Sequence, residues 1–232
     1  MLKLKYSEKE NDIMDASMDL FIKYGYDKTT VAEIAENAGI SKGAVYLHFA
    51  SKEQLFESLL FREVARHNLR WFELVNEDPK GGLLSGMYKN HIKAMTESPL
   101  MTAIFKRDTL VLGSYIKKKD NMFKNGGSTT MRADFVRMMQ EAGAIRRDAD
   151  PVITAHIMDV FGASLVSMHE YKPDDEIPPI DDVINGIADF MDRALTPADG
   201  GDSEAGKEVL RRVIFDAIAQ YEAEESEEKD HD

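Results

Sequence analysis

Basic and hydroxyl side chains gather in one short segment near the N-terminus of this chain. Residues 37–52 contain Lys42 and Lys52 but no acid, whereas the whole chain has a formal net charge of −13. Lysine ammonium groups neutralise phosphates, and hydroxyl groups donate to phosphate oxygens. Because a local patch decides phosphate contact, this segment suits a nucleic-acid backbone even within an acidic protein.

The spacing in residues 30–49 predicts two short helices joined by a tight turn. Thr30 and Glu33 have the spacing of a capping box, Gly39 supplies the turn, and Ser41 can cap the second helix. Such a pair is a helix-turn-helix, whose second helix can enter the major groove of DNA. Taken alone, the pattern also fits an ordinary helix pair with solvated lysines. The candidate DNA-binding residues are Thr30, Ser41, Lys42, Gly43, Ala44, Tyr46, Leu47, His48 and Lys52.

These candidates would contact different parts of the DNA. The lysines and hydroxyl groups would bind phosphates, and Gly43 would let the backbone approach the DNA closely. Ala44 and Leu47 could contact thymine methyl groups, and so influence which sequence is preferred.

No other chemistry is indicated by the sequence. The chain has no cysteine, and it shows no nucleophile–base pair, carboxylate dyad, glycine-rich phosphate loop or metal-binding spacing. His156 and Asp159 lie three residues apart, but a metal site would need a further ligand. We therefore expect a binding protein rather than an enzyme, with no catalytic residues, no metal and no cofactor.

Apolar residues that recur with a period near 3.6 predict an all-α fold. A first stripe runs from Ile13 to Tyr24, and a long helix opens at Ser51. Further helices are expected at 83–96, 98–124 (in one or two pieces), 128–142, 151–171, 180–195 and 203–223. The predicted domains are a helix-turn-helix domain at 1–50, a larger helical domain at 51–223 (to which the resemblance described below assigns effector binding and dimerisation), and a disordered acidic tail at 224–232.

The sequence favours a cytoplasmic location. No apolar run approaches the roughly 18–20 residues of a membrane span. The N-terminus also lacks the apolar run of a signal peptide.

The C-terminal part of the chain is rich in methionine, which adapts to ligands of varied shape. Of the 13 methionines, ten lie at or beyond Met87. Together with phenylalanines they could line an apolar pocket, although ordinary core packing is the alternative for each of them. His91, His156 and His169 are the polar candidates. The candidate ligand-binding residues are Met95, Phe105, Met122, Phe135, Met138, Met139 and Phe161.

The helices expected at 151–171 and 180–195 are the candidate dimer interface. The run Gly162-Ala163-Ser164 would permit close helix approach, and apolar residues on both helices could form a two-fold four-helix bundle. Packing within one chain is the alternative. The candidate interface residues are Val160, Gly162, Leu165, Ile184, Ile187 and Met191.

One further set of residues carries a family resemblance. Over residues 10–60 the pattern is Leu20-Phe21, Gly25, Thr29-Thr30, Ile34-Ala35, Ala38-Gly39, Ser41-Lys42-Gly43, Tyr46, His48-Phe49, Ser51-Lys52-Glu53 and Leu55. In order and spacing this resembles the TetR family of transcriptional regulators. Leu47 departs from the aromatic residue often found at its position, so no operator sequence can be carried over.

The resemblance implies an all-helical homodimer with an N-terminal three-helix DNA-binding domain and a larger domain that senses small molecules. Its partners would be pseudo-palindromic double-stranded DNA and an apolar or amphipathic effector that releases a repressor. An effector-independent regulator or an activator is the alternative.

Overall fold

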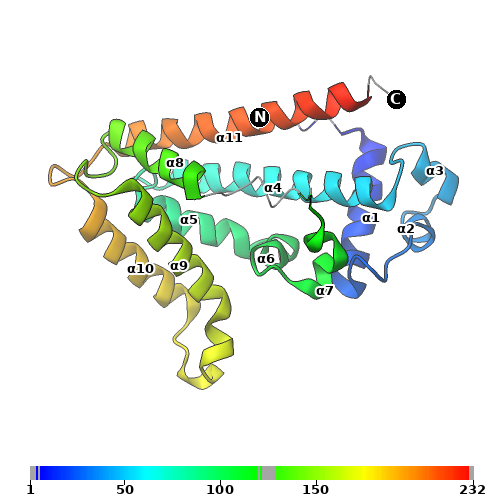
Figure 1. The fold of residues 1–232 in the computed structure, drawn as a ribbon, viewed down its shortest axis with the longest axis horizontal. Helices are drawn as coiled ribbons and strands as arrows, with labels where there is room; N and C mark the ends of the chain where they lie inside the picture. The colour runs from blue at the N-terminus through cyan, green and yellow to red at the C-terminus, as the bar shows by residue number, and fades with distance from the viewer. Residues whose placement is uncertain (1–3, 5, 120, 122–128, 230–232) are drawn as a thin grey trace. The chain divides into compact units, whose positions relative to one another are not determined.

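The chain folds into helices alone over the part that can be described. The computed structural model describes residues 4, 6–119, 121 and 129–229, and within these ranges no β-strand is present. The all-α prediction is therefore confirmed. The chain divides into a first unit, residues 1–66 and 98–124, and a second unit, residues 67–97 and 125–232. Figure 1 shows the helices in chain order.

The first unit begins with a capped helix. Helix α1 (Glu8–Tyr24) starts at Ser7, whose side chain accepts from the Glu10 amide while Glu10 accepts from the Ser7 amide. Its buried face follows the predicted apolar stripe. It ends at Gly25, whose φ of +84° lies in the left-handed region that glycine adopts without a steric penalty. The other elements of this unit are α2 (Val31–Asn37), α3 (Lys42–Tyr46), the first half of α4 (Lys52–Glu77), α6 (Pro99–Phe105), α7 (Thr109–Leu112) and η1 (Gly113–Lys117).

Aromatic rings from three separate stretches of sequence meet in the core of the first unit. The Phe56 ring of α4 packs edge-on to Phe21 of α1 and to Tyr115 of η1, at centroid distances of 4.7 and 5.2 Å. Tyr26 packs against all three rings. The core of this compact unit therefore contains residues of α4 and of 98–117 in addition to those of the N-terminal helices.

A buried guanidinium joins α1 to α4. Arg62 is fully buried, and its Nη2 atom lies 2.6 Å from a carboxylate oxygen of Asp15. Its Nη1 atom donates to the backbone and side-chain oxygens of Asn11, both at 3.2 Å, and its Nε atom donates to Glu63 at 3.1 Å. Every nitrogen of the guanidinium thus has an acceptor, which is the condition under which a buried charge is tolerated.

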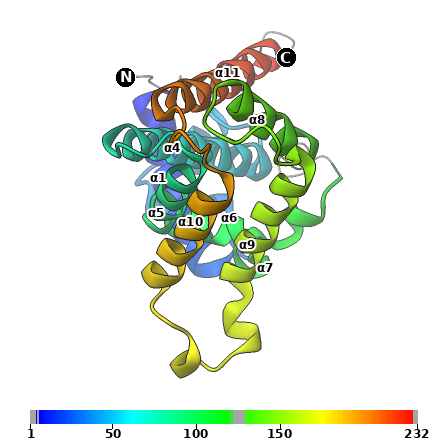
Figure 2. The ribbon, with the colours of Figure 1, turned by 90° about the vertical axis from the view of Figure 1, so that its left-hand side faces the viewer.

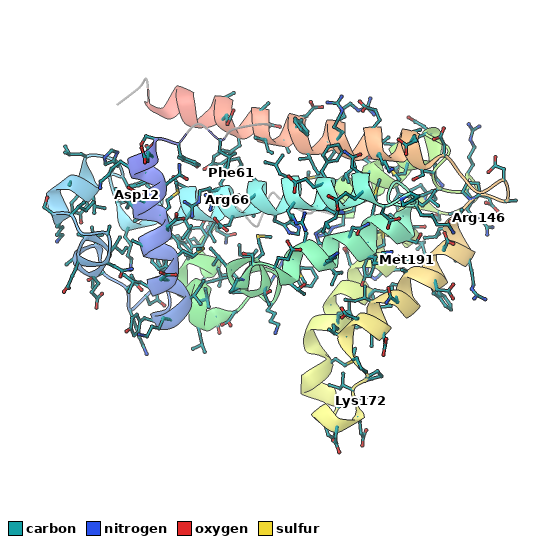
Figure 3. All side chains as sticks on the ribbon, turned by 180° about the vertical axis from the view of Figure 1, so that it is seen from behind. Asp12, Phe61, Arg66, Arg146, Lys172 and Met191 are labelled. Carbon is teal, nitrogen blue, oxygen red and sulfur yellow. The ribbon has the colours of Figure 1, made fainter. Side chains whose placement is uncertain are left out.

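The second unit is built from longer helices. It contains the second half of α4, then α5 (Leu84–Thr96), α8 (Thr129–Glu141), α9 (Pro151–Tyr171), η2 (Asp174–Glu176), α10 (Ile180–Leu195) and α11 (Ser203–Lys229). Helix α10 packs on α5, α9 packs on α8, and α11 contacts α8, as Figure 2 shows. Arg146 and Lys172 lie at opposite ends of the α9–α10 pair in Figure 3.

The helix boundaries agree with the sequence except in two places. Where the sequence predicts one helix or two over residues 98–124, the described residues 98–117 form the short helices α6 and α7 followed by η1. Asp108 starts α7 by accepting from the amides of Leu110 and Val111, and Gly113 ends it at a φ of +54°. Helix α11 continues to Lys229, so residues 224–229 are helical where we expected a disordered tail. Five of these six residues are glutamate or lysine, which favour helix. Residues 230–232 lie outside the described residues.

We predict that Arg62→Ala lowers the free energy of unfolding by about 3–5 kcal/mol, because it removes a fully buried side chain whose hydrogen bonds to Asn11 and Asp15 join α4 to α1. Arg66 offers a matched control on the same helix, since its side chain is 48% exposed while pairing with the same two carboxylates. Arg66→Ala should cost less than about 1 kcal/mol. Urea unfolding followed by circular dichroism measures both. Equal losses for the two variants would contradict the role given to Arg62.

Candidate nucleic-acid interface

Helices α2 and α3 form the predicted helix-turn-helix. Ile34, Ala35 and Val45 are buried and hold the two helices together. The turn between them passes through Gly39, whose φ is +65°, and the amide of Ile40 donates to the Ala35 carbonyl at 2.9 Å. Nothing crowds Gly39, so its positive φ is what requires glycine there.

Each helix of the motif starts at an exposed hydroxyl group. Thr30 caps α2 as predicted, because its Oγ1 atom accepts from the Glu33 amide and donates to the Glu33 carboxylate at 2.8 Å. Ser41 caps α3 by accepting from the Ala44 amide at 3.1 Å. These contacts hold both hydroxyl groups at the surface beside the free amides of the two first turns, a combination that binds phosphate.

Helix α3 presents polar and apolar side chains to solvent together. Ser41, Lys42 and Gly43 are exposed, Tyr46 is 46% exposed, and Leu47 is 85% exposed. Ala44 and His48 are partly buried. The exposed leucine is the notable one, because an apolar side chain left in water beside a lysine is typical of a binding surface.

Gly43 has no structural reason to be glycine within this chain. It lies inside α3 with an ordinary backbone angle, and a Cβ atom there would meet only Ser41 Oγ, at 3.8 Å. Glycine inside a helix costs about 0.5–1 kcal/mol relative to alanine. An unexplained cost at an exposed position points to something outside the chain that approaches the α3 backbone.

Lys52 differs from the other predicted DNA-binding residues. Its Nζ atom donates to the backbone carbonyls of Tyr26 and Thr29, at 2.7 and 3.0 Å, and lies 4.3 Å from the centre of the Tyr26 ring. Burial lowers the pKa of the Lys52 ammonium, with the nearby Asp27 opposing that fall. The structure therefore shows Lys52 fixing the connection between α1 and α2, a role that the sequence did not indicate.

Residues 110–114 hold the same connection through different contacts. The Tyr26 amide donates to the Val111 carbonyl at 2.9 Å. The Asp27 carboxylate accepts from the amide and the hydroxyl of Ser114, which lowers the pKa of that carboxyl. A Cβ atom at Gly113 would overlap Asp27, and one at Gly25 would overlap the Leu110 carbonyl. Asp27 and Ser114 are 87 positions apart, so no local spacing could have indicated this pairing.

The predicted ligand-binding residues do not come from one unit. Phe105 lies on α6 in the first unit and is partly buried. In the second unit, Met95 and Met139 are buried. The other members described there are partly buried: Phe135, Met138 and Phe161. Met122 lies outside the described residues.

The predicted dimer residues fall into two groups. Ile184 and Met191 are buried on α10, the helix that packs on α5. Met191 lies on the α5 side of α10 in Figure 3. Gly162 is also buried, and Leu165 and Ile187 are partly buried. Val160 is 49% exposed and shares one face of α9 with two residues that the sequence did not single out: Ile153 at 57% and Ile157 at 46% exposed.

The described residues contain neither a membrane-spanning helix nor a metal-binding cluster. None of the helices described is both long enough and apolar enough to cross a membrane. Where side chains are described, no three His, Asp or Glu residues are grouped so as to hold a metal ion.

The helix-turn-helix matches a known family. Residues 13–59 match the family described as "Bacterial regulatory proteins, tetR family". An uncharacterized HTH-type transcriptional regulator of Bacillus subtilis, YerO, is 54% identical over 52 residues, which are 22% of this chain and 18% of YerO. The chain thus matches less than a fifth of that relative, and the match is confined to about 50 residues.

Other similarities extend over most of the chain. The transcriptional repressor KstR2 of Mycobacterium tuberculosis is 25% identical over 169 residues, covering 72% of this chain and 83% of KstR2. The crystal structure of the regulator FadR from Bacillus subtilis, in complex with stearoyl-CoA, has a TM-score of 0.56 at 16% identity, over 78% of this chain and 96% of that one. These proteins are regulators rather than enzymes, and the shared fold extends beyond the helix-turn-helix. This chain therefore carries the N-terminal helix-turn-helix domain of the TetR family of bacterial regulatory proteins.

Proposed function

We propose that this protein is a dimeric, cytoplasmic transcriptional regulator that inserts α3 into the major groove of a pseudo-palindromic DNA site. The observation that carries the proposal is the exposed face of α3, where Gly43 removes a side chain and Leu47 is left in solvent beside Lys42. An α-helix fits the major groove, where leucine can contact thymine methyl groups.

We further propose that it is a repressor released by an apolar or amphipathic small molecule. Two similar proteins support this direction: KstR2 is named a repressor, and FadR was crystallised with stearoyl-CoA. The buried methionines of the second unit suit an apolar ligand. An effector-independent regulator or an activator is the alternative, and it predicts DNA binding that no amphipathic ligand alters.

Two routes could carry an effector's influence to the helix-turn-helix. One is α4, which continues from the first unit into the second. The other is the chain itself, because α5 leads through Glu97 into α6, α7 and η1. Ser114 of η1 binds Asp27, which lies in the connection before α2. An effector acts by binding two conformations unequally, so either route would couple the sites only if its conformation changes.

The dimer would form through α9 and α10. Ile153, Ile157 and Val160 leave an apolar stripe on α9, and Phe190 on α10 is 69% exposed. Gly186 precedes Phe190 by one helical turn, and nothing within 4 Å of it would meet a Cβ atom. Exposed apolar side chains beside a glycine of this kind suit close packing of a second helix. Two copies related by a two-fold axis would then place two α3 helices on a two-fold DNA site.

Gly43→Ala should change stability and DNA affinity in opposite directions. Alanine favours the helix, so the free energy of unfolding should rise by about 0.5–1 kcal/mol. The added methyl group should hold the backbone away from DNA and weaken binding roughly tenfold or more, a free-energy loss of about 1.4 kcal/mol. Fluorescence anisotropy with a duplex that the wild-type protein selects from a random pool measures affinity. An unchanged affinity in a stabilised variant would contradict the placement of α3 against DNA.

Replacing Lys42 and replacing Lys52 with methionine should have different effects on the stability of the protein. Lys52→Met should lower the free energy of unfolding by about 1–3 kcal/mol, because the Tyr26 and Thr29 carbonyls lose a charged donor. Lys42→Met should change stability by less than about 0.5 kcal/mol. It should still weaken binding to any duplex and reduce the slope of log affinity against log salt by about one. If the Lys52→Met variant were as stable as the Lys42→Met variant, the hydrogen bonds from Lys52 to the two carbonyl groups would not contribute to stability.

Ile157→Glu should convert the dimer into a monomer, because it places two charges in the interface between two α9 helices. Light scattering should then give a mass near 26.2 kDa. Leu110→Glu is the matched control, since Leu110 is 82% exposed on α7 in the first unit. A dimer that survives Ile157→Glu would place the interface elsewhere.

A further inference from the structure

Two polar side chains in the second unit are buried without a hydrogen-bond partner. His67 on α4 is 5% exposed, and Tyr88 on α5 is 6% exposed. Both ring nitrogens of His67 and the hydroxyl group of Tyr88 have no hydrogen-bond partner in the described part of the chain. The Ala94 backbone lies near enough to His67 to raise the pKa of the ring, although the contact does not meet hydrogen-bond geometry.

The surroundings of these groups are aromatic and otherwise satisfied. The His67 ring packs edge-on to His91 at 4.8 Å, and His91 packs edge-on to Trp71 at 4.9 Å. The Trp71 indole donates to the Met87 carbonyl at 2.9 Å. His67 thus lies where the second half of α4 meets α5, and Tyr88 lies on α5 one helical turn before His91.

An unpartnered buried polar group is costly, and natural proteins contain few of them. Phenylalanine in place of tyrosine or histidine would remove that cost while keeping an aromatic ring. The free-energy cost of burying these polar groups is offset if a molecule from outside the chain supplies the missing hydrogen-bond partners.

We propose that His67 and Tyr88 form the polar end of a small-molecule site between α4 and α5, which takes an amphipathic ligand with an uncharged hydroxyl or carbonyl group. This inference rests on the proposed effector control and specifies the chemistry of that effector. Tyr88 can donate to the ligand oxygen, and either nitrogen of a neutral His67 can donate or accept.

The charge of the site excludes an ionised ligand group. Burial lowers the pKa of His67 to about 4 and raises the pKa of Tyr88 to about 12, so both are neutral at pH 7. Arg132 acts electrostatically on the neighbouring His91, but it is already paired with Asp159. A carboxylate or an ammonium group would therefore enter this site without a counter-charge, which is more costly than a neutral group.

The first test needs no ligand. His67→Phe and Tyr88→Phe should each leave the melting temperature of the purified protein unchanged or raise it, because each removes a polar group that has no partner. Trp71→Phe is the matched control, and it should lower the melting temperature, because the Met87 carbonyl loses its donor. A lower melting temperature for both His67→Phe and Tyr88→Phe would show that the two groups have partners within the chain, and would overturn the proposal.

The second test uses ten-carbon probes that differ only in their polar group. Decanol and 2-decanone should raise the melting temperature of the wild-type protein, whereas decanoate and decylamine should do so less. Both phenylalanine variants should bind decanol roughly threefold to tenfold more weakly, the usual effect of losing one hydrogen bond. Equal binding by wild type and variants would overturn the proposal. So would failure of decanol and 2-decanone to bind, which would assign the two groups to buried water.

The same probes separate this inference from the proposed function. If decanol binds through His67 and Tyr88 but leaves DNA affinity unchanged, the assigned site is supported and the proposed effector control is contradicted. If decanol releases DNA equally from wild type and variants, effector control stands and the assigned site is wrong.

Discussion

The short connection between α1 and α2 is the constraint on which the DNA-binding surface depends. Its carbonyl groups at Tyr26 and Thr29 accept from one ammonium group, that of Lys52, and its amide at Tyr26 donates to the Val111 carbonyl. Because Thr30 caps α2 directly after this connection, its position fixes where α2 begins and, through the tight turn at Gly39, where α3 lies. The polar bonds come from residues distant in sequence, so the helix-turn-helix depends on contacts outside its own residues.

Arg62 in the first unit and the pair His67 and Tyr88 in the second differ in whether their buried polar atoms have hydrogen-bond partners. In the first unit every nitrogen of the Arg62 guanidinium has an acceptor, so its burial serves to fix α1 against α4. In the second unit, His67 and Tyr88 are equally buried and have none. Buried polar groups with all their hydrogen bonds stabilise a core. Buried polar groups without hydrogen bonds either destabilise the core or bind a further molecule. This difference is why we assign a structural role to the first group and a binding role to the second.

What could be predicted from the sequence follows from the range of the interactions. Capping pairs such as Thr30 with Glu33 and apolar stripes of period 3.6 act within a few residues, and the helices that they predicted are present. The division of residues 98–117 into short helices could not be predicted, because this stretch packs in one core with residues of α1 and α4. For the same reason the pairing of Asp27 with Ser114, the tie made by Lys52 and the burial of His67 left no local pattern in the sequence. The packing of α10 on α5 could not be predicted either, because apolar spacing shows that a helix has a buried face but not which neighbour covers it.

The proposed DNA-binding surface and the proposed dimer surface each contain a glycine that nothing within the chain explains. A glycine is usually explained by a positive φ, as at Gly39, or by a neighbour that leaves no room for a Cβ atom, as at Gly82 beside Ser203. Among the glycines whose surroundings the structure describes, only Gly43 and Gly186 have neither explanation. Both lie inside helices, where glycine costs stability, and both are exposed. One lies on the helix proposed to enter DNA, and the other lies one turn from an exposed phenylalanine on the helix proposed to meet a second copy. The reason for each glycine is therefore to be sought in what approaches the backbone from outside: a DNA groove at Gly43 and a partner helix at Gly186.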